Sequence, residues 1–354
     1  MFYRSMTAMC LLATQASAEV PNVATDIAPV HSLVARVMQG VGEPALVMQQ
    51  GASPHGYSLR PSEARILQNA DLVVWIGEDL SPWLEDAIET VATGAHSLEL
   101  LHSEGTHVHE FREEAVFGGH DDHDDHDDHD DHDDHDDHDD HDDHDHVENH
   151  DDKHEDHGHD DHDDHHDEHK DEHAGHDDHD RHNHDGADPH AWLDPENAIV
   201  WLNSIAEELS ELDPANAEIY AMNAEVGATE IQAAGEEITT QLEPFHDARF
   251  VVFHDAYQYF EEAFGLEVTG SIQLSDAAAP SAARLSELHA EIKEHGISCV
   301  FAEPQFNDSL VKSVAPEGTN TGILDPLATD IPQGPALYTT WLRGLANSVT
   351  DCLG

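Results

Sequence analysis

The chain has 354 residues and a formal net charge of −64, from 77 acidic and only 13 basic side chains. This charge argues against nucleic acid and anionic membrane surfaces as partners, because both bind through basic patches. Apart from an N-terminal leader and one acidic run, roughly 270 residues remain, which is enough for two ordinary domains or one large one.

Residues 1–18 have the pattern of a secretory signal peptide: Arg4, a short apolar stretch, and Ala16-Ser17-Ala18. The apolar part is much shorter than the ~20 residues of a transmembrane helix. Thr7-Ala8-Met9, which precede Cys10, match a lipid-attachment box poorly. The sequence therefore predicts cleavage after Ala18 and a soluble exported protein without stable membrane insertion.

Loss of the leader removes Cys10 and leaves two cysteines, Cys299 and Cys352. An even pair in an exported chain predicts one disulfide. Two free buried thiols are the alternative that the composition leaves open.

Residues 19–110 alternate between apolar strands and helices. Val30, Leu33, Val34 and Val37 have helical spacing, which Gly40 ends. Predicted strands are residues 21–28, 45–49, 71–77 and 97–101, and predicted helices are residues 30–37, 62–70 and 82–92. This alternation predicts an N-terminal α/β lobe with a parallel sheet.

Residues 111–187 contain the acidic run and predict a disordered His/Asp-rich loop. Residues 120–184 hold 23 of the 34 histidines, and their only apolar residues are Val147 and Ala174, so no core can offset the entropy of ordering. Imidazole and carboxylate together predict low-affinity zinc binding. The regularly spaced histidines are His120, His123, His126, His129, His132, His135, His138, His141 and His144. A solvated acidic linker is the alternative, although a linker requires no imidazole.

The chain beyond the loop predicts the rest of a two-lobed α/β fold. Residues 188–212 complete the first lobe, and residues 213–244 form a rigid linking helix of roughly 45 Å. Residues 245–354 form a second α/β lobe, also with a parallel sheet flanked by helices. Its predicted strands are residues 250–254, 267–272, 298–302 and 322–324, and its helices are residues 256–264, 281–295, 308–315 and 336–349.

Four residues outside the run are candidate metal ligands: His55, His190, His254 and Asp325. Each lies in a loop or at a helix start compatible with the carboxyl edge of a parallel sheet, where open α/β sheets bind ligands. Three imidazoles with a carboxylate or a water make a four-coordinate zinc site. The alternative for each histidine is a capping or solvent-facing role, and for Asp325 a turn before Pro326.

The other histidines and the enzyme-like motifs receive plainer interpretations. We expect structural or surface roles for His31, His96, His246, His289 and His295. Residues 165–169 and 169–173 fit the H-x-x-E-H metalloprotease pattern, but composition alone explains such matches in this run. Residues 40–45 fit G-x-G-x-x-A, but they follow a predicted helix and precede a predicted strand, whereas the dinucleotide-binding fingerprint needs the reverse order. The sequence therefore predicts that the protein is not an enzyme.

The sequence resembles the ZnuA-like family, the periplasmic zinc-binding components of ABC importers. The resemblance rests on residues 51–62, 67–77, 188–195 and 324–327 and on the His/Asp-rich insertion. It implies two lobes joined by a long helix, with His55, His190 and His254 as imidazole ligands in the cleft between them. It also implies a Cys299–Cys352 disulfide. Some members have a glutamate where this chain has Pro54, so the fourth ligand is open between Asp325, water and a loop histidine.

This resemblance implies a function: high-affinity capture of Zn²⁺ in the periplasm and delivery to a zinc ABC permease, by a protein we expect to be a monomer. The His/Asp-rich loop would gather zinc near the cleft. Alternatives are a periplasmic zinc buffer or chaperone without a transporter, an importer subunit for manganese, iron or nickel, and a metallohydrolase. Three imidazoles argue against manganese and iron, which favour carboxylates.

Overall fold

The computed structural model describes residues 20–112, 186–273, 280–306 and 309–354. The predicted signal peptide and the nine regularly spaced histidines of the acidic run lie outside these residues. Their predicted roles stay predictions.

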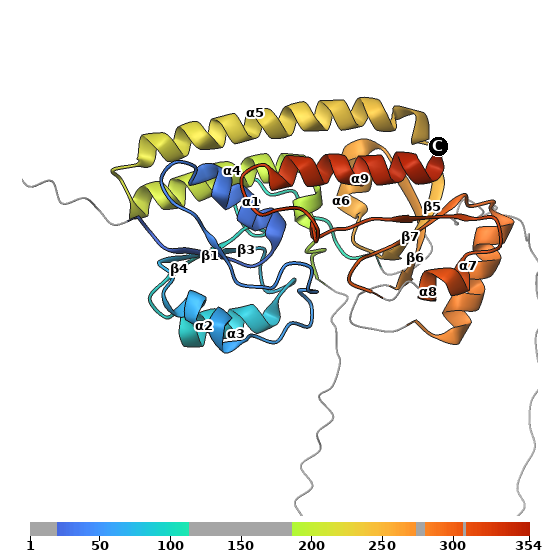
Figure 1. The fold of residues 1–354 in the computed structure, drawn as a ribbon, viewed down its shortest axis with the longest axis horizontal. Coiled ribbons are helices and arrows are strands. Elements are labelled where there is room, and N and C mark those ends of the chain that lie inside the picture. Colours follow the sequence, from blue (N-terminus) through green and yellow to red (C-terminus); the bar gives the residue numbers. More distant parts are fainter. Residues whose placement is uncertain (1–19, 113–185, 274–279, 307–308) are drawn as a thin grey trace, which may run out of the picture. The chain divides into compact units, whose positions relative to one another are not determined.

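The first lobe contains a parallel four-stranded sheet with strand order β2-β1-β3-β4 (Figure 1). Each of its strands overlaps one of the predicted strands, and a helix connects each strand to the next. The strands are β1 (Val23–Thr25), β2 (Ala45–Leu46), β3 (Leu72–Trp75) and β4 (His96–Glu99). The helices are α1 (Ala28–Val37), α2 (Pro61–Gln68) and α3 (Pro82–Val91), and α4 (Pro195–Leu212) joins them after the insertion.

Alternate side chains of the first sheet enter two different cores. Leu72 and Val74 share a core with residues of α1 and α4, whereas Val73 shares the opposite core with Leu67 of α2 and Leu84 of α3. Helices therefore cover both faces, as a continuous apolar strand requires in a parallel sheet.

The second lobe repeats this strand order as β6-β5-β7-β8, again all parallel. Its strands are β5 (Arg249–His254), β6 (Glu267–Gln273), β7 (Cys299–Ala302) and β8 (Asn320–Ile323). Its helices are α6 (Gln258–Phe264), α7 (Ala282–Glu294), α8 (Ser309–Val314) and α9 (Leu337–Leu353). Residues of α6 and α9 share the core on one face of the sheet, and residues of α7 and α8 share the core on the other. The predicted α/β fold is confirmed.

The long helix α5 (Ala217–Leu242) packs against α4, α1 and α9, as Figure 1 shows. Its 26 residues span about 39 Å, somewhat less than predicted, because a turn at residues 213–216 delays its start and a short 3₁₀ turn begins at Glu243. Gly227 allows the close approach of α5 to its neighbours: a Cβ there would lie 2.9 Å from Leu202 Cδ1 and from Arg36 Cγ.

Local signals in the sequence account for several helix ends. Asp194 caps α4 by accepting a 2.8 Å hydrogen bond from the backbone N–H of Glu196, and Pro195 occupies the first helical position. Gly265 ends α6 with a φ of 64°, a conformation that costs glycine little.

The two lobes share one continuous hydrophobic core. Trp192 Nε1 donates to the carbonyl of Pro326 at 2.8 Å, and the Tyr338 hydroxyl donates to the carbonyl of Trp192 at 2.8 Å. Trp192 of the first lobe is therefore held by two residues of the second. The exact lobe limits at residues 212, 244 and 245 stay predictions.

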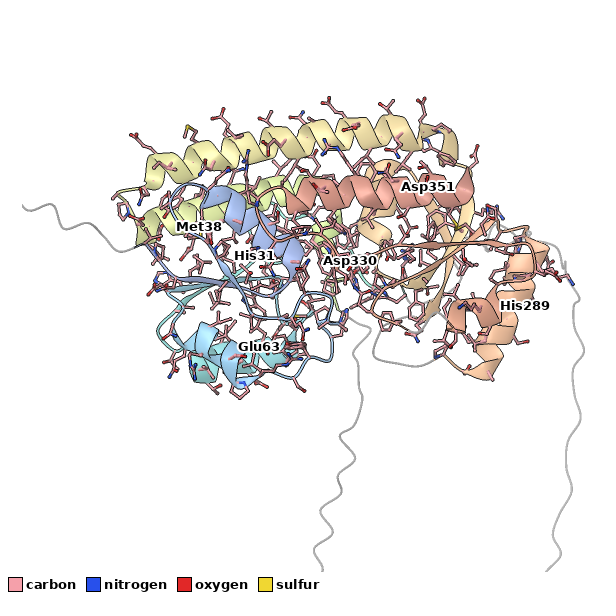
Figure 2. The ribbon with its side chains drawn as sticks, in the orientation of Figure 1. His31, Met38, Glu63, His289, Asp330 and Asp351 are labelled. Carbon is pink, nitrogen blue, oxygen red and sulfur yellow. A yellow bond between two sulfur atoms is a disulfide. The ribbon has the colours of Figure 1, made fainter. Side chains whose placement is uncertain are left out.

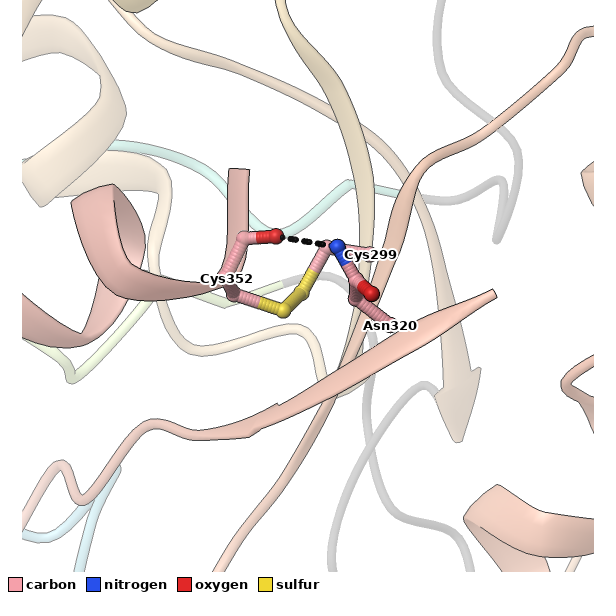
Figure 3. The surroundings of a disulfide bond; sticks show 3 residues. All are labelled: Cys299, Asn320 and Cys352. Atoms are coloured by element: carbon pink, nitrogen blue, oxygen red, sulfur yellow. Dashed lines mark hydrogen bonds between the residues drawn. A yellow bond between two sulfur atoms is a disulfide. The ribbon is translucent and has the colours of Figure 1, made fainter. Parts of the chain in front are cut away.

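The predicted disulfide between Cys299 and Cys352 is confirmed (Figure 3). It joins the first residue of β7 to the last turn of α9, and Asn320 Nδ2 donates to the carbonyl of Cys352 at 2.9 Å beside it.

His31, on α1 in Figure 2, is buried and contacts the carbonyl of Pro44 at 3.2 Å, as expected of a structural histidine. Among the described residues, no helix combines the length and apolarity that spanning a membrane requires.

Candidate metal centre

Three of the four predicted ligands come together between the lobes. One ring nitrogen from each of His55, His190 and His254 lies within 4.8 Å of the other two. His55 lies in the loop after β2, and His190 immediately precedes the turn that leads into α4. His254 is the last residue of β5, at the carboxyl edge of the second sheet. This placement follows the rule that open parallel sheets bind ligands at that edge.

A buried carboxylate orients each of the two innermost histidines. His190 Nδ1 is 2.7 Å from Asp188 Oδ1, and His254 Nδ1 is 2.7 Å from Glu303 Oε1. Where these carboxyl groups are ionised they can only accept a hydrogen bond, so each Nδ1 then carries the proton and each Nε2 is left as the electron-pair donor. Metal-ligating histidines in proteins are characteristically held in this way.

The two Nε2 atoms of His190 and His254 face one another at 3.4 Å. Two acceptor nitrogens cannot hydrogen-bond to each other, whereas one cation between them can be ligated by both. With zinc–nitrogen bonds of about 2.0–2.1 Å, tetrahedral geometry places two ligand atoms about 3.3 Å apart. The observed separation therefore fits one metal ion of that size.

His55 is the third member of the group, and it is half-buried where the other two are buried. Its ring centroid lies 5.4 Å from that of His190 and 6.4 Å from that of His254. Trp83 Nε1 donates to the carbonyl of Pro54 at 2.7 Å, and the Tyr57 hydroxyl donates to Glu63 Oε1 at 2.6 Å. The loop on both sides of His55 is thus tied to α2 and α3.

The cavity at this site has a volume of about 10 Å³ and is lined by all three histidines and by Glu303. A cavity needs about 10–15 Å³ by this measure to hold one water molecule. The space fits an ion or a single water.

The surroundings of the three histidines are rich in buried carboxyl groups. Burial raises the pKa of Asp188 to about 7, and it raises the pKa of Asp255 to about 7 as well. Arg112 opposes both effects and pairs with Asp255 at 2.7 Å and with Glu261 at 2.6 Å. Carboxyl groups held away from water favour a cation nearby, because it stabilises their ionised form.

The structure does not bring Asp325 into the group of ring nitrogens. Its Oδ1 accepts hydrogen bonds from the backbone N–H of Leu327, from Gln305 Nε2 and from the Thr329 hydroxyl, each at 3.1 Å. In this structure, the Asp325 carboxylate therefore accepts hydrogen bonds within the turn that the Asp-Pro sequence predicts. Its role as fourth ligand stays a prediction, alongside water and a loop histidine.

Reasoning from sequence missed several residues of this region. Asp188 was not among the predicted site residues, although it stands two positions before His190, and Glu303 was not either, although it directly follows a predicted strand. His107 and His109, between β4 and the insertion, were also missed. With Glu262 they form a second group of ligand atoms within 4.8 Å of one another.

Two parallel-sheet lobes with an ion-sized, histidine-lined cavity between them define a class: two-lobed solute-binding proteins whose solute is a metal ion. Residues 23–352 match the model of the family described as ZnuA, zinc-uptake complex component A, periplasmic. The chain belongs to the ZnuA family.

Curated relatives agree with this assignment. The chain is 45% identical over 345 residues to "High-affinity zinc uptake system protein ZnuA" of Paracoccus denitrificans. This alignment covers 97% of this chain and 94% of the relative. It is 43% identical over 337 residues to the protein of the same name in Brucella abortus, which covers 95% of this chain and 92% of the relative.

Solved structures share the fold. A crystal structure of ZnuA superposes with a TM-score of 0.67 at 21% identity and covers 95% of this chain and 100% of that one. The solute-binding protein FpvC of Pseudomonas aeruginosa, in complex with Mn²⁺, also gives 0.67, at 19% identity, with 95% of this chain and 99% of that one covered. These similarities support the two-lobed architecture.

Proposed function

We propose that this protein binds Zn²⁺ with high affinity in the periplasm and delivers it to the permease of an ABC-type zinc importer. His55, His190 and His254 would be the protein ligands. The observation that carries this proposal is the pair of Nε2 atoms 3.4 Å apart, each oriented by a buried carboxylate on the far side of its ring.

The donor set supports zinc as the cargo. Three imidazoles suit zinc, whereas manganese and iron favour carboxylate oxygens. A similar fold binds Mn²⁺ in FpvC, so the fold by itself does not decide between metals. The fourth position would be taken by water, by Asp325 or by a histidine of the insertion, and the acidic insertion would concentrate zinc near the cleft.

Competition with a chromogenic chelator tests the site. His190→Ala should weaken zinc binding by more than about 100-fold. Loss of a residue that only hydrogen-bonds to a ligating histidine already lowers metal affinity about 10–100-fold, and loss of the ligand itself should cost more. His289→Ala is the matched control: His289 lies on α7 (Figure 2), is exposed and contacts the carbonyl of Val314 at 3.1 Å. Equal affinities for His190→Ala and the wild-type protein would overturn the assignment.

Delivery and export need separate tests. We propose cleavage after Ala18, a monomeric mature protein and docking to a membrane permease. Mass spectrometry of the exported protein would locate the cleavage site. Zinc transport by the purified permease and its ATPase in liposomes, with and without this protein, distinguishes an importer subunit from a zinc buffer: a buffer would bind zinc and leave transport unchanged.

A further inference from the structure

We propose that His107, His109 and Glu262 form a second zinc site, weaker than the cleft site and outside it. The three side chains offer two imidazole nitrogens and one carboxylate oxygen, all within 4.8 Å of one another. Two imidazoles and a carboxylate are a donor set that zinc uses at sites where water completes the coordination.

The separation of the ligand atoms suits an ion. His109 Nε2 lies 3.0 Å from Glu262 Oε2, and this buried nitrogen makes no hydrogen bond. A tetrahedral zinc ion separates adjacent ligand atoms by about 3.3 Å. Only a small outward movement of the exposed Glu262 side chain would admit the metal.

The backbone of both histidines is held in place. Asn197 binds His107 twice: its Oδ1 accepts from the backbone N–H at 2.7 Å, and its Nδ2 donates to the carbonyl at 2.9 Å. The N–H of His109 donates to the Tyr259 hydroxyl at 3.0 Å, and its carbonyl accepts from the N–H of Asp188 at 2.8 Å. This strand-like segment is therefore built in advance of any ligand.

The environment of the group favours a cation. A groove of about 470 Å³ opens beside it, and the described residues that line this groove include four carboxylates and no lysine or arginine. One of these carboxylates, Asp194 Oδ2, lies 3.8 Å from His107 Nδ1. Negative charge in a groove raises the local concentration of cations.

Exposure explains why the second site would be the weaker one. The side chains of His107 and Glu262 are 53% and 61% exposed, whereas those of His190 and His254 are 4% and 5% exposed. Ordering two exposed side chains opposes binding, and water screens the carboxylate.

The second site is also connected to the first. The Tyr259 hydroxyl donates to the carbonyl of Asp188 at 2.7 Å, and the Asp188 carboxylate holds His190. His109 lies beside Glu110, which pairs with Ala187 where the two ends of the insertion meet. The site thus lies next to the paired residues that flank the insertion in the sequence, and Tyr259 and Asp188 link it to the cleft histidine His190.

Histidine footprinting on the full-length protein tests the proposal residue by residue. Diethylpyrocarbonate modifies accessible imidazole, and peptide mass spectrometry reports the rate at each histidine while free zinc is set with a metal buffer. We expect zinc to protect His107 at least tenfold, at concentrations above those that saturate the cleft. His96, equally exposed at 53%, should keep its rate. Unchanged modification of His107 at millimolar zinc overturns the proposal.

Two variants separate a ligand from a general acidic field. Glu262→Gln should raise the zinc concentration for half-protection of His107 about tenfold or more. Glu236→Gln removes the same charge from the same groove but leaves the three ligands intact, and it should shift half-protection less than threefold. Equal shifts in both variants would mean that charge alone attracts the ion. Protection of the peptide that carries His190 reports the cleft site separately in the same samples, so each assignment can fail alone.

Discussion

The two lobes have the same strand order, but the carboxyl edges of their sheets carry different side chains. In each sheet the two central strands, β1 and β3 or β5 and β7, end side by side at the carboxyl edge. In the first lobe Asp26 follows β1 and accepts from the N–H of Ile76 at 2.9 Å, just beyond β3. In the second lobe Glu303 follows β7 and holds His254, the last residue of β5.

A buried carboxylate thus joins the two central strands in both lobes. The first lobe gives this carboxylate backbone partners alone, since the N–H of Ile27 also donates to Asp26 at 2.7 Å. Burial still raises the pKa of Asp26 to about 6, because two hydrogen bonds do not replace the lost hydration. The second lobe gives the carboxylate an imidazole, and this difference makes the contact part of the candidate metal centre.

The largest expected effect concerns the disulfide, which the first lobe lacks. Replacing both Cys299 and Cys352 by alanine should lower the free energy of unfolding by about 4 kcal/mol, since the bond closes a loop with a sequence separation of 53. Zinc affinity should change less than threefold, because Cys299 begins β7 and Glu303 follows its other end, about 13 Å away along the strand.

Urea unfolding and chelator competition on the same samples measure both quantities. Treatment with a reducing agent is the control: it should destabilise the wild-type protein and leave the variant unchanged. A fall in affinity as large as the fall in stability would show that the disulfide positions the site.

The next effect tests the two carboxylates against each other. Glu303→Gln should weaken zinc binding about 10–100-fold, because a neutral amide supports the imidazole of His254 less well. Asp26→Asn is the matched control in the other lobe: it should lower stability, since two backbone N–H groups lose their charged acceptor, and leave zinc affinity unchanged. Competition titration and thermal unfolding distinguish the two outcomes. Equal losses of affinity in both variants would contradict the difference we infer between the lobes.

How much the sequence could predict differs between elements and contacts. The predicted strands and helices are present because their apolar pattern matches the faces that they bury: Leu72–Trp75, for example, is continuously apolar and buried on both faces. The three candidate ligands were predictable because each lies in a loop, at a strand end or at a helix start compatible with the carboxyl edge of a sheet. The pairing of His254 with Glu303 spans 49 residues and depends on how β5 and β7 lie together, which periodicity does not encode.

The contacts of Asp325 and His109 were hidden for the same reason. A carboxylate in an Asp-Pro turn and a ligand at a sheet edge have the same local sequence, so the hydrogen bonds of Asp325 with Leu327 and Thr329 could not be read from it. His109 meets Glu262 from a distant helix. Contacts between residues far apart in the chain thus set the details of a site whose general position the sequence already indicates.

The smallest expected effect comes from removing the feature that most distinguishes the first lobe, its insertion. Deletion of residues 121–182 should leave one tight zinc site, with affinity within threefold of the wild-type protein. The ends of the insertion are already joined: the N–H of Phe111 donates to the carbonyl of Gly186 at 3.3 Å, next to the pairing of Glu110 with Ala187. Shortening the loop should stabilise the fold by at most about 2 kcal/mol.

What the deletion should change is the number of weakly bound ions and the rate of capture at scarce zinc, because the acidic, imidazole-rich segment no longer concentrates cations. Each ion bound there must gather side chains from a chain that we expect to be disordered, at an entropic cost of about 1–2 kcal/mol per ordered residue, whereas the cleft histidines are already positioned. Calorimetry on the deletion variant measures stoichiometry and affinity together. Loss of all tight binding would mean that the insertion supplies a ligand to the cleft, most simply the missing fourth one, and that the first lobe is incomplete without it.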